Sequence, residues 1–197
     1  MTPLALGILG SGKGSNCRAI LEQIRAGNLD AEVRFVVSDV LEAGILDIAR
    51  AFEVPNAYLP PGKYRTRLEP QVEQDLVKML RDAEVNLVVL AGFMRVLKAP
   101  MLDAFPRRII NIHPSLLPKF PGIEAWKQAL AAGEKTTGCT VHYVESGIDT
   151  GEIIAQREVP ISPGDTPATL HERIQLAEYA LYPSVIAQFA RGERQSK

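Results

Sequence analysis

The 197-residue chain is poor in the side chains that build metal centres and disulfide scaffolds. It has only two cysteines and three histidines, and Cys17 and Cys139 do not have the spacing of metal ligands. The sequence leaves open whether these two thiols pair with each other. A reducing compartment is the default for such sparse cysteine, so we expect a cytoplasmic protein.

The chain also lacks a charge excess and long apolar runs. Lys and Arg number 22 against 23 Asp and Glu, for a formal net charge of −1, so no basic field favours nucleic acid. No run approaches the roughly 20 apolar residues that cross a membrane, and the N-terminal segment has no basic region or cleavage signature of a signal peptide. We therefore expect neither nucleic acid nor a membrane as a partner. The 46% hydrophobic and 23% charged residues are typical of a globular protein.

Short apolar runs alternate with helical patterns along the chain. This alternation predicts an α/β fold with a doubly wound, mostly parallel sheet flanked by helices. Ligands of such sheets bind beyond the carboxyl ends of the strands. We expect strands at 4–10, 33–38, 56–59, 86–92, 107–113, 137–144 and 151–159, and helices at 15–26, 45–52, 68–82, 124–131 and 166–190.

The first loop at that edge reads GSGKGSN, at residues 10–16. Its glycines allow the backbone to approach a ligand, and Ser15 can cap the helix that follows. Free N–H groups at a helix start favour an anion such as a phosphate. The spacing matches neither a Walker A loop nor a dinucleotide fingerprint, and a plain glycine turn with a serine cap is the alternative.

A second loop, FMRVL at residues 93–97, follows the apolar run NLVVLAG. An aromatic ring, a thioether and an arginine at a strand end can line a flat apolar ligand site. The alternative is that Phe93 and Met94 belong to the core and that Arg95 is a solvated cation.

The third candidate is NIHPSLLPKFPG, at residues 111–122. Asn111 and His113 are two residues apart at the end of a strand and so point to the same face, and the prolines after them end the strand. An amide donor beside an imidazole suits a reaction that develops negative charge on a carbonyl oxygen while a proton moves. A core histidine satisfied by the backbone is the alternative.

Asp149 lies in GIDTGEII, a loop between two expected strands. There its carboxylate can face His113, and we expect it to raise the pKa of that imidazole. A turn aspartate that bonds its own backbone is the alternative. His142 and His171 have no comparable neighbours in the sequence, and we interpret both as structural or surface residues.

Five segments, in this order and at this spacing, resemble the phosphoribosylglycinamide formyltransferases, a folate-dependent family of purine biosynthesis. They are GSGKGSN, AGFMRVL, NIHPSLLPKFPG, GCTVHYV and DTGEII, and the resemblance covers essentially the whole chain. It implies that the amine of glycinamide ribonucleotide attacks the formyl group of 10-formyltetrahydrofolate. The folate is a consumed co-substrate, so the resemblance implies no tightly bound cofactor and no metal.

The resemblance also assigns residues to roles. It implies a catalytic trio of Asn111, His113 and Asp149, with Asn111 also facing the folate. Arg67 matches a folate-contacting arginine, and Arg65 is the alternative because YRTRLEPQ has two extra residues. The implied ribonucleotide site comprises Gly14, Ser15, Asn16, Gln175 and Glu178, and the folate site comprises Arg67, Met94, Arg95, Val96, Leu97, Glu145, Ser146, Gly147, Ile148 and Asp149.

We expect one domain over residues 1–197, with a phosphate-binding half at about 1–100 and a folate-binding, catalytic half at about 101–190. Its partners would be the two small-molecule substrates, and the sequence does not distinguish a monomer from a homodimer.

Three other functions account for part of these motifs. Methionyl-tRNA formyltransferase has a similar NxHPSLLP segment, but also a C-terminal domain and a basic tRNA surface that we do not expect here. Formyltetrahydrofolate deformylase carries an added N-terminal domain, whereas our first expected strand begins at Leu4. A non-catalytic, flavodoxin-like nucleotide-binding domain explains the glycine loop, but not the trio of Asn111, His113 and Asp149.

Overall fold

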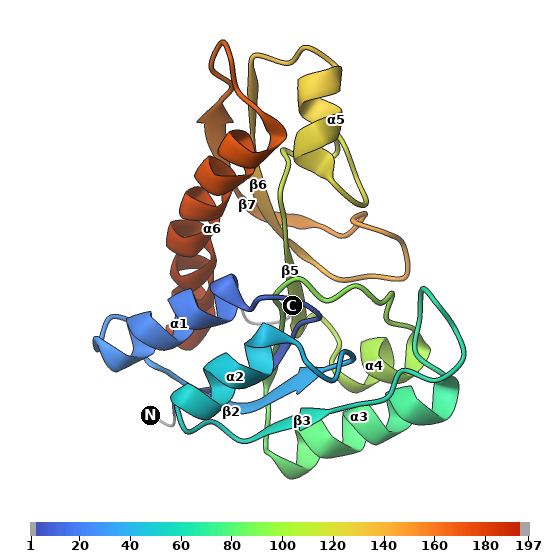
Figure 1. Ribbon diagram of the computed structural model, residues 1–197. Helices are drawn as coiled ribbons and strands as arrows, with labels where there is room; N and C mark the ends of the chain where they lie inside the picture. The colour runs from blue at the N-terminus through green and yellow to red at the C-terminus, as the bar shows by residue number, and fades with distance from the viewer. Residues whose placement is uncertain (1–2, 194–197) are drawn as a thin grey trace.

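A seven-stranded sheet runs through the computed structural model, which describes residues 3–193 (Figure 1). The strand order is β3-β2-β1-β4-β5-β6-β7. The five strands β3, β2, β1, β4 and β5 pair in parallel with one another, whereas β6 is antiparallel to both β5 and β7. This confirms the mostly parallel sheet. The strands are β1 (Leu4–Leu9), β2 (Ala31–Ser38), β3 (Asn56–Tyr58), β4 (Leu87–Leu90), β5 (Ile109–His113), β6 (Thr136–Tyr143) and β7 (Ile153–Pro160).

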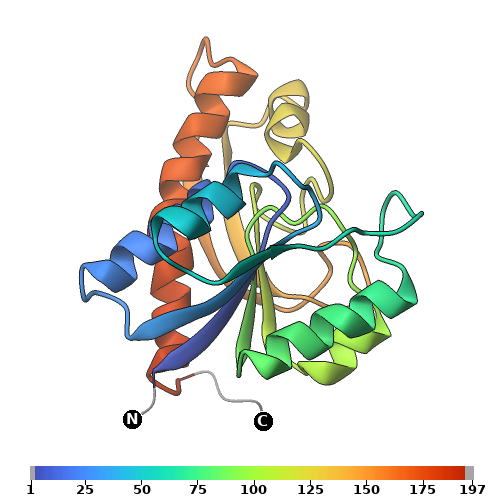
Figure 2. The ribbon, with the colours of Figure 1, turned by 60° about the horizontal axis from the view of Figure 1, so that its bottom comes forward.

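Helices cover both faces of this sheet, as the two ribbon views show (Figures 1 and 2). Buried side chains of α1, α2 and α6 join one hydrophobic cluster with the strands, and those of α3 and α4 join a second cluster on the other face. The helices are α1 (Ser15–Arg25), α2 (Gly44–Ala51), α3 (Pro70–Asp82), α4 (Ala99–Ala104), α5 (Ala125–Ala131) and α6 (Pro167–Ala190). None of those in the described part is long and apolar enough to cross a membrane.

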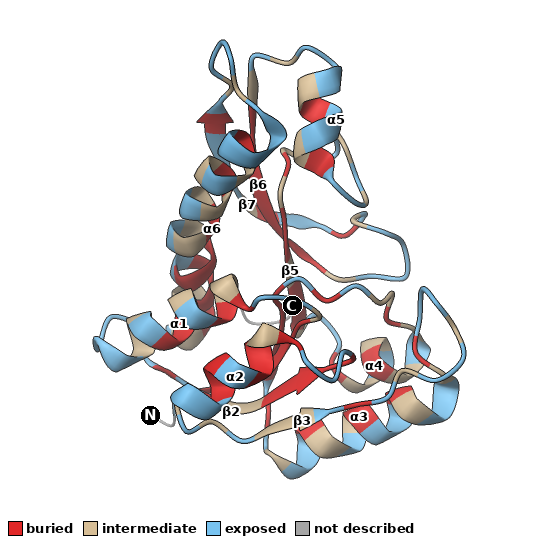
Figure 3. Cartoon of the chain, in the orientation of Figure 1, coloured by how far each residue is buried: buried red, intermediate tan, exposed pale blue. Residues whose placement is uncertain are grey.

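The central strands are buried along their whole length (Figure 3). Along β1 the side chains alternate between the two clusters, Ile8 in one and Leu9 in the other. This explains why the sequence there is a continuous apolar run without polar alternation. Cys17 and Cys139 are free thiols buried in the first of these clusters.

The strand order reverses between β1 and β4, and this switch point brings two predicted site loops together. The Ser11 N–H in the glycine loop donates to the Gly92 carbonyl after β4, at 3.0 Å. On the other side of β4, the antiparallel pairing of β5 with β6 places Asn111 opposite His142. The candidate site therefore lies along the carboxyl ends of β1, β4 and β5, as expected for such sheets.

Candidate active site

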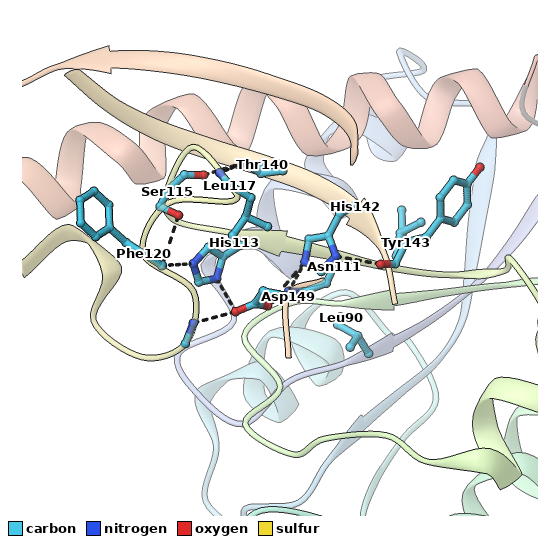
Figure 4. A network of polar contacts seen from close by, with 12 residues as sticks. Leu90, Asn111, His113, Ser115, Leu117, Phe120, Thr140, His142, Tyr143 and Asp149 are labelled. Atoms are coloured by element: carbon cyan, nitrogen blue, oxygen red, sulfur yellow. Dashed lines mark hydrogen bonds and ion pairs between the residues drawn. The ribbon is translucent and has the colours of Figure 1, made fainter. Parts of the chain in front are cut away.

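Three predicted residues meet at the end of β5 (Figure 4). Nδ1 of His113 lies 3.3 Å from Oδ2 of Asp149, and Nδ2 of Asn111 lies 3.5 Å from its Oδ1. Asp149 comes from the loop between β6 and β7 and has a φ of 52°. The structure thus brings together the amide, the imidazole and the carboxylate that the sequence singled out.

His113 is buried, and both of its ring nitrogens face acceptors. Nε2 lies 2.8 Å from the Phe120 carbonyl oxygen, opposite the nitrogen that faces Asp149. Burial lowers the pKa of His113, and the Asp149 carboxylate and the Phe120 carbonyl only partly offset this. The Asp149 carboxylate raises this pKa as expected, but the net pKa is lowered. Asp149 does favour the charged imidazolium, but the loss of water around the ring is the larger effect.

Asp149 is held as a carboxylate by its neighbours. Burial raises its pKa, but the contacts with His142, the Gly122 N–H and the His113 imidazole outweigh burial and hold the pKa below its usual value. The Gly122 N–H donates to Oδ2 at 2.8 Å. Asp149 is therefore ionised at neutral pH, and it does more than bond its own backbone.

His142 also belongs to this cluster, so its interpretation as a residue without such neighbours is wrong. Its Nε2 lies 3.1 Å from Nδ2 of Asn111 and 3.6 Å from Oδ1 of Asp149. Nδ1 faces the Tyr143 carbonyl at 2.8 Å, so Nδ1 carries the proton in the neutral ring and Nε2 accepts from Asn111. Only the pairing of β5 with β6 reveals this role, because it places His142 opposite Asn111. His171 instead stacks on Trp126.

The segment after His113 is held against β6. The Thr140 hydroxyl donates to the Ser115 carbonyl at 2.6 Å and accepts the Leu117 N–H at 3.0 Å. The Ser115 hydroxyl donates to the Lys119 carbonyl at 2.6 Å. These bonds fold the chain back so that the Phe120 carbonyl reaches His113. Prolines end the strand as predicted, but hydrogen bonds to β6 fix the return.

The glycine turn at residues 10–16 opens α1. Gly14, with a φ of 77°, is the N-cap, and no side chain caps the helix. Ser15 is instead the first helical residue, so its predicted capping role is wrong. A Cβ at Gly14 would lie 2.6 Å from Cα of Ile45, whereas one at Gly12 would meet nothing within 4 Å. Packing against α2 thus requires Gly14 to be a glycine, while Gly12 faces open space.

Asn16 connects this turn to α6, because its Nδ2 donates to Oε2 of Glu178 at 2.8 Å. Glu178 is almost completely buried. Burial raises its pKa to about 7, against the opposing hydrogen bond from Asn16. Gln175 is half-buried and lies one turn earlier on α6, on the same side as Glu178. The predicted ribonucleotide residues of the two helices are therefore neighbours.

The predicted folate residues differ in what they expose. Met94 is 62% exposed, whereas Leu97 is buried in the core, so Leu97 can face a ligand only through its main chain. Arg95 is paired with Asp39 rather than solvated. Arg67 forms a β-bridge with Val96 and lies over the Tyr64 ring. In the 145–149 loop, Ile148 is exposed.

A family model described as formyl transferase matches residues 5–186. The chain belongs to the formyl transferase family. Within residues 3–193, no group of three or more His, Cys, Asp or Glu side chains is arranged to hold a metal ion.

Relatives in the formyl transferase family match over almost the whole chain. Phosphoribosylglycinamide formyltransferase from Bacillus subtilis is 44% identical over 191 residues, which cover 95% of this chain and 97% of the relative. The human trifunctional purine biosynthetic protein adenosine-3 is 40% identical over 185 residues, or 94% of this chain but only 18% of that protein.

Solved structures of this family agree with the fold. Glycinamide ribonucleotide transformylase 1 from Symbiobacterium toebii superposes with a TM-score of 0.94 at 44% identity, covering 100% of this chain and 92% of that one. Phosphoribosylglycinamide formyltransferase from Bacillus halodurans has a TM-score of 0.90 at 39% identity, covering 96% and 97%. These similarities confirm the family and the fold that the motifs predicted.

Proposed function

We propose that this protein transfers the formyl group of 10-formyltetrahydrofolate to the amine of 5′-phosphoribosylglycinamide. The products are the N-formyl ribonucleotide and tetrahydrofolate, a step of de novo purine (IMP) biosynthesis. The observation that carries the proposal is the cluster of Asn111, His113 and Asp149 at the end of β5, in a chain 44% identical to a phosphoribosylglycinamide formyltransferase.

Attack of the amine on the formyl carbon forms a tetrahedral species with an oxyanion. Nδ2 of Asn111 and the His113 imidazolium stabilise that oxygen, and each donor of this kind lowers a barrier by about 3–4 kcal/mol. Nε2 of His113 donates to the Phe120 carbonyl in this structure. During the reaction, Nε2 gives up its hydrogen bond to the Phe120 carbonyl and donates to the oxyanion instead. Nδ1 keeps its contact with Asp149.

Asp149 orients the imidazole and favours its charged form against the effect of burial. A proton must also pass from the attacking nitrogen to the departing folate nitrogen. Asp149 is ionised at neutral pH and assists this relay through water.

The ribonucleotide phosphate binds at residues 14–16. The first turn of α1 contains no acidic side chain, so its free N–H groups are available to an anion. Gln175 and Glu178 then hold the glycinamide part. The folate lies between the 94–97 wall, with Arg67 beside Val96, and the 145–149 loop. Arg65 is the alternative, and its carbonyl accepts Nη1 of Arg95 in the wall.

Within one domain, both halves of the chain contribute to both substrates. The first half supplies the 14–16 turn for the ribonucleotide and Met94 for the folate. The second half supplies Glu178 for the ribonucleotide and the 145–149 loop for the folate. We assign no tightly bound cofactor and no metal to the reaction, and we place the protein in the cytoplasm. Its partners are the two small molecules, and it acts as a monomer or a homodimer.

The test is formyl transfer from 10-formyltetrahydrofolate, measured with and without glycinamide ribonucleotide. Formyl transfer that depends on the ribonucleotide supports the proposal. Release of formate without an acceptor would indicate a deformylase, transfer to methionyl-tRNA would indicate the tRNA enzyme, and absence of any turnover would indicate a binding module.

A further inference from the structure

Asp39 follows β2 and contacts two of the loops that form the site. Its Oδ1 accepts the Ser11 hydroxyl at 2.5 Å, and its Oδ2 accepts Nε of Arg95 at 2.6 Å. Ser11 belongs to the glycine loop and Arg95 to the 94–97 wall. One carboxylate therefore joins the predicted phosphate loop to the predicted folate wall.

Ser11 and Arg95, the two partners of Asp39, make further hydrogen bonds to the neighbouring loops. The Ser11 hydroxyl also accepts the Met94 N–H at 2.8 Å, so it bonds the wall directly. Nη1 of Arg95 donates to the carbonyls of Tyr64 and Arg65, in the loop that carries Arg67. Three loops from different parts of the chain thus meet around Asp39.

The Asp39 side chain is 2% exposed and that of Arg95 is 17% exposed. A buried ion pair adds little net stability, because the desolvation of both charges offsets their attraction. Its charge-assisted hydrogen bonds are directional, however, and fix where each partner lies. The bonds around Asp39 engage Ser11 as donor and acceptor and hold Arg95 through Nε and Nη1.

We propose that Asp39 is a positioning residue for both substrates, holding the phosphate loop, the folate wall and the Arg67 loop in register. The inference rests on the proposed function. Asp39 contacts none of Asn111, His113 and Asp149 in the bonds described above, so it acts on substrate binding and leaves the chemical step unchanged.

The test is Asp39→Asn, which keeps the shape but leaves one acceptor oxygen for two donors. Ser11 and Arg95 donate to different oxygens of Asp39, so in the asparagine one of these two donors faces an NH2 group in place of an acceptor. We expect the KM of each substrate to rise about tenfold, a loss of about 1.4 kcal/mol. We expect kcat to stay within about threefold of the wild type, with its pH profile unmoved.

Ser11→Ala is the second variant, because it keeps the Asp39–Arg95 pair and removes the acceptor for the Met94 N–H. Both variants should accelerate amide exchange at Met94 in the ligand-free protein. Asp165→Asn is the matched control, since Asp165 also pairs with an arginine but bonds only Ser162, Thr169 and Arg173 among its described partners.

A lowered melting temperature with both KM values within about twofold of the wild type would overturn the inference, because Asp39 would then serve stability alone. Equal KM increases in Asp165→Asn would overturn it as well. Absence of formyl transfer in the wild type would instead refute the proposed function. Exchange at Met94 in Asp39→Asn would still decide whether Asp39 holds the loops together. If Asp39→Asn does not fold, KM values for both substrates within about twofold of the wild type in Ser11→Ala would overturn the inference, because that variant breaks the link from Asp39 through Ser11 to the Met94 N–H.

Discussion

Oδ2 of Asp149 lies 3.3 Å from Nδ1 of His113, so a loop carboxylate and a strand-end imidazole form one buried pair. Burial lowers the pKa of this imidazole and the carboxylate partly restores it. Burial and the Asp149 carboxylate together therefore set the pH at which His113 is protonated.

Asp149→Asn removes the charge that favours the imidazolium. The pKa of His113 should fall further, so activity that needs the protonated ring should be lost at a lower pH than in the wild type. We expect kcat to fall about 100-fold while circular dichroism shows the same fold. Asp30→Asn, at an exposed position, is the control. An unmoved pH profile would mean that Asp149 does not tune His113.

His142→Ala should release the Asn111 amide from the acceptor that now orients it. We expect kcat to fall about tenfold with both KM values almost unchanged, because the oxyanion donor is misaligned but the substrates still bind. His142→Gln should recover part of the loss, since its amide oxygen can accept from Asn111. His171→Ala serves as the comparison, and an equal loss in that variant would contradict an orienting role.

We expect substitutions at Gly12 and Gly14 to have different effects, the first on substrate binding and the second on stability. Gly12→Val should raise the KM for glycinamide ribonucleotide more than about tenfold at an unchanged melting temperature, because a side chain there enters open space. Gly14→Val should lower the melting temperature, since its φ is 77° and its Cβ would meet Ile45. Steady-state kinetics and thermal melts together test this, and an unchanged KM in Gly12→Val would place the phosphate elsewhere.

Glu178→Gln should stabilise the protein above neutral pH. The folded pKa is about 7 against an ordinary 4.5, so between these values the folded state keeps a proton that the unfolded state has lost. The free energy of unfolding therefore falls as pH rises through this window, by up to about 3 kcal/mol. Urea melts at pH 5 and pH 8 should show a gain for Glu178→Gln at pH 8 only. An equal gain at both pH values would contradict the raised pKa.

The sequence predicted the parts of the site that depend on a few adjacent residues. The glycine turn, the strand-end Asn111 and His113, and the loop around Asp149 each have a local pattern. The alternation of apolar runs and helical spacing predicted the order of strands and helices as well. Helix α4 was missed because it has six residues and only Met101 is buried, too little for a period to emerge.

Features that depend on distant segments could not be predicted. The place of His142 follows from the register of β5 against β6, which no local pattern encodes. The lowered pKa of His113 follows from its burial, which the Asp149 carboxylate and the Phe120 carbonyl only partly offset. The need for glycine at residue 14 follows from contact with Ile45 in α2. Each of these three features depends on contacts with residues that are not adjacent in the sequence.

The antiparallel pairing of β5 and β6 has a consequence for how this chain can vary in length. Asn111 faces His142 because their strands pair at one register, and a one-residue slip turns every side chain of β6 to the other face. An insertion or deletion within β6 would present Val141 or Tyr143 to Asn111 instead. Length changes are therefore tolerable at turns such as the one around Gly133, but not between Thr136 and Tyr143.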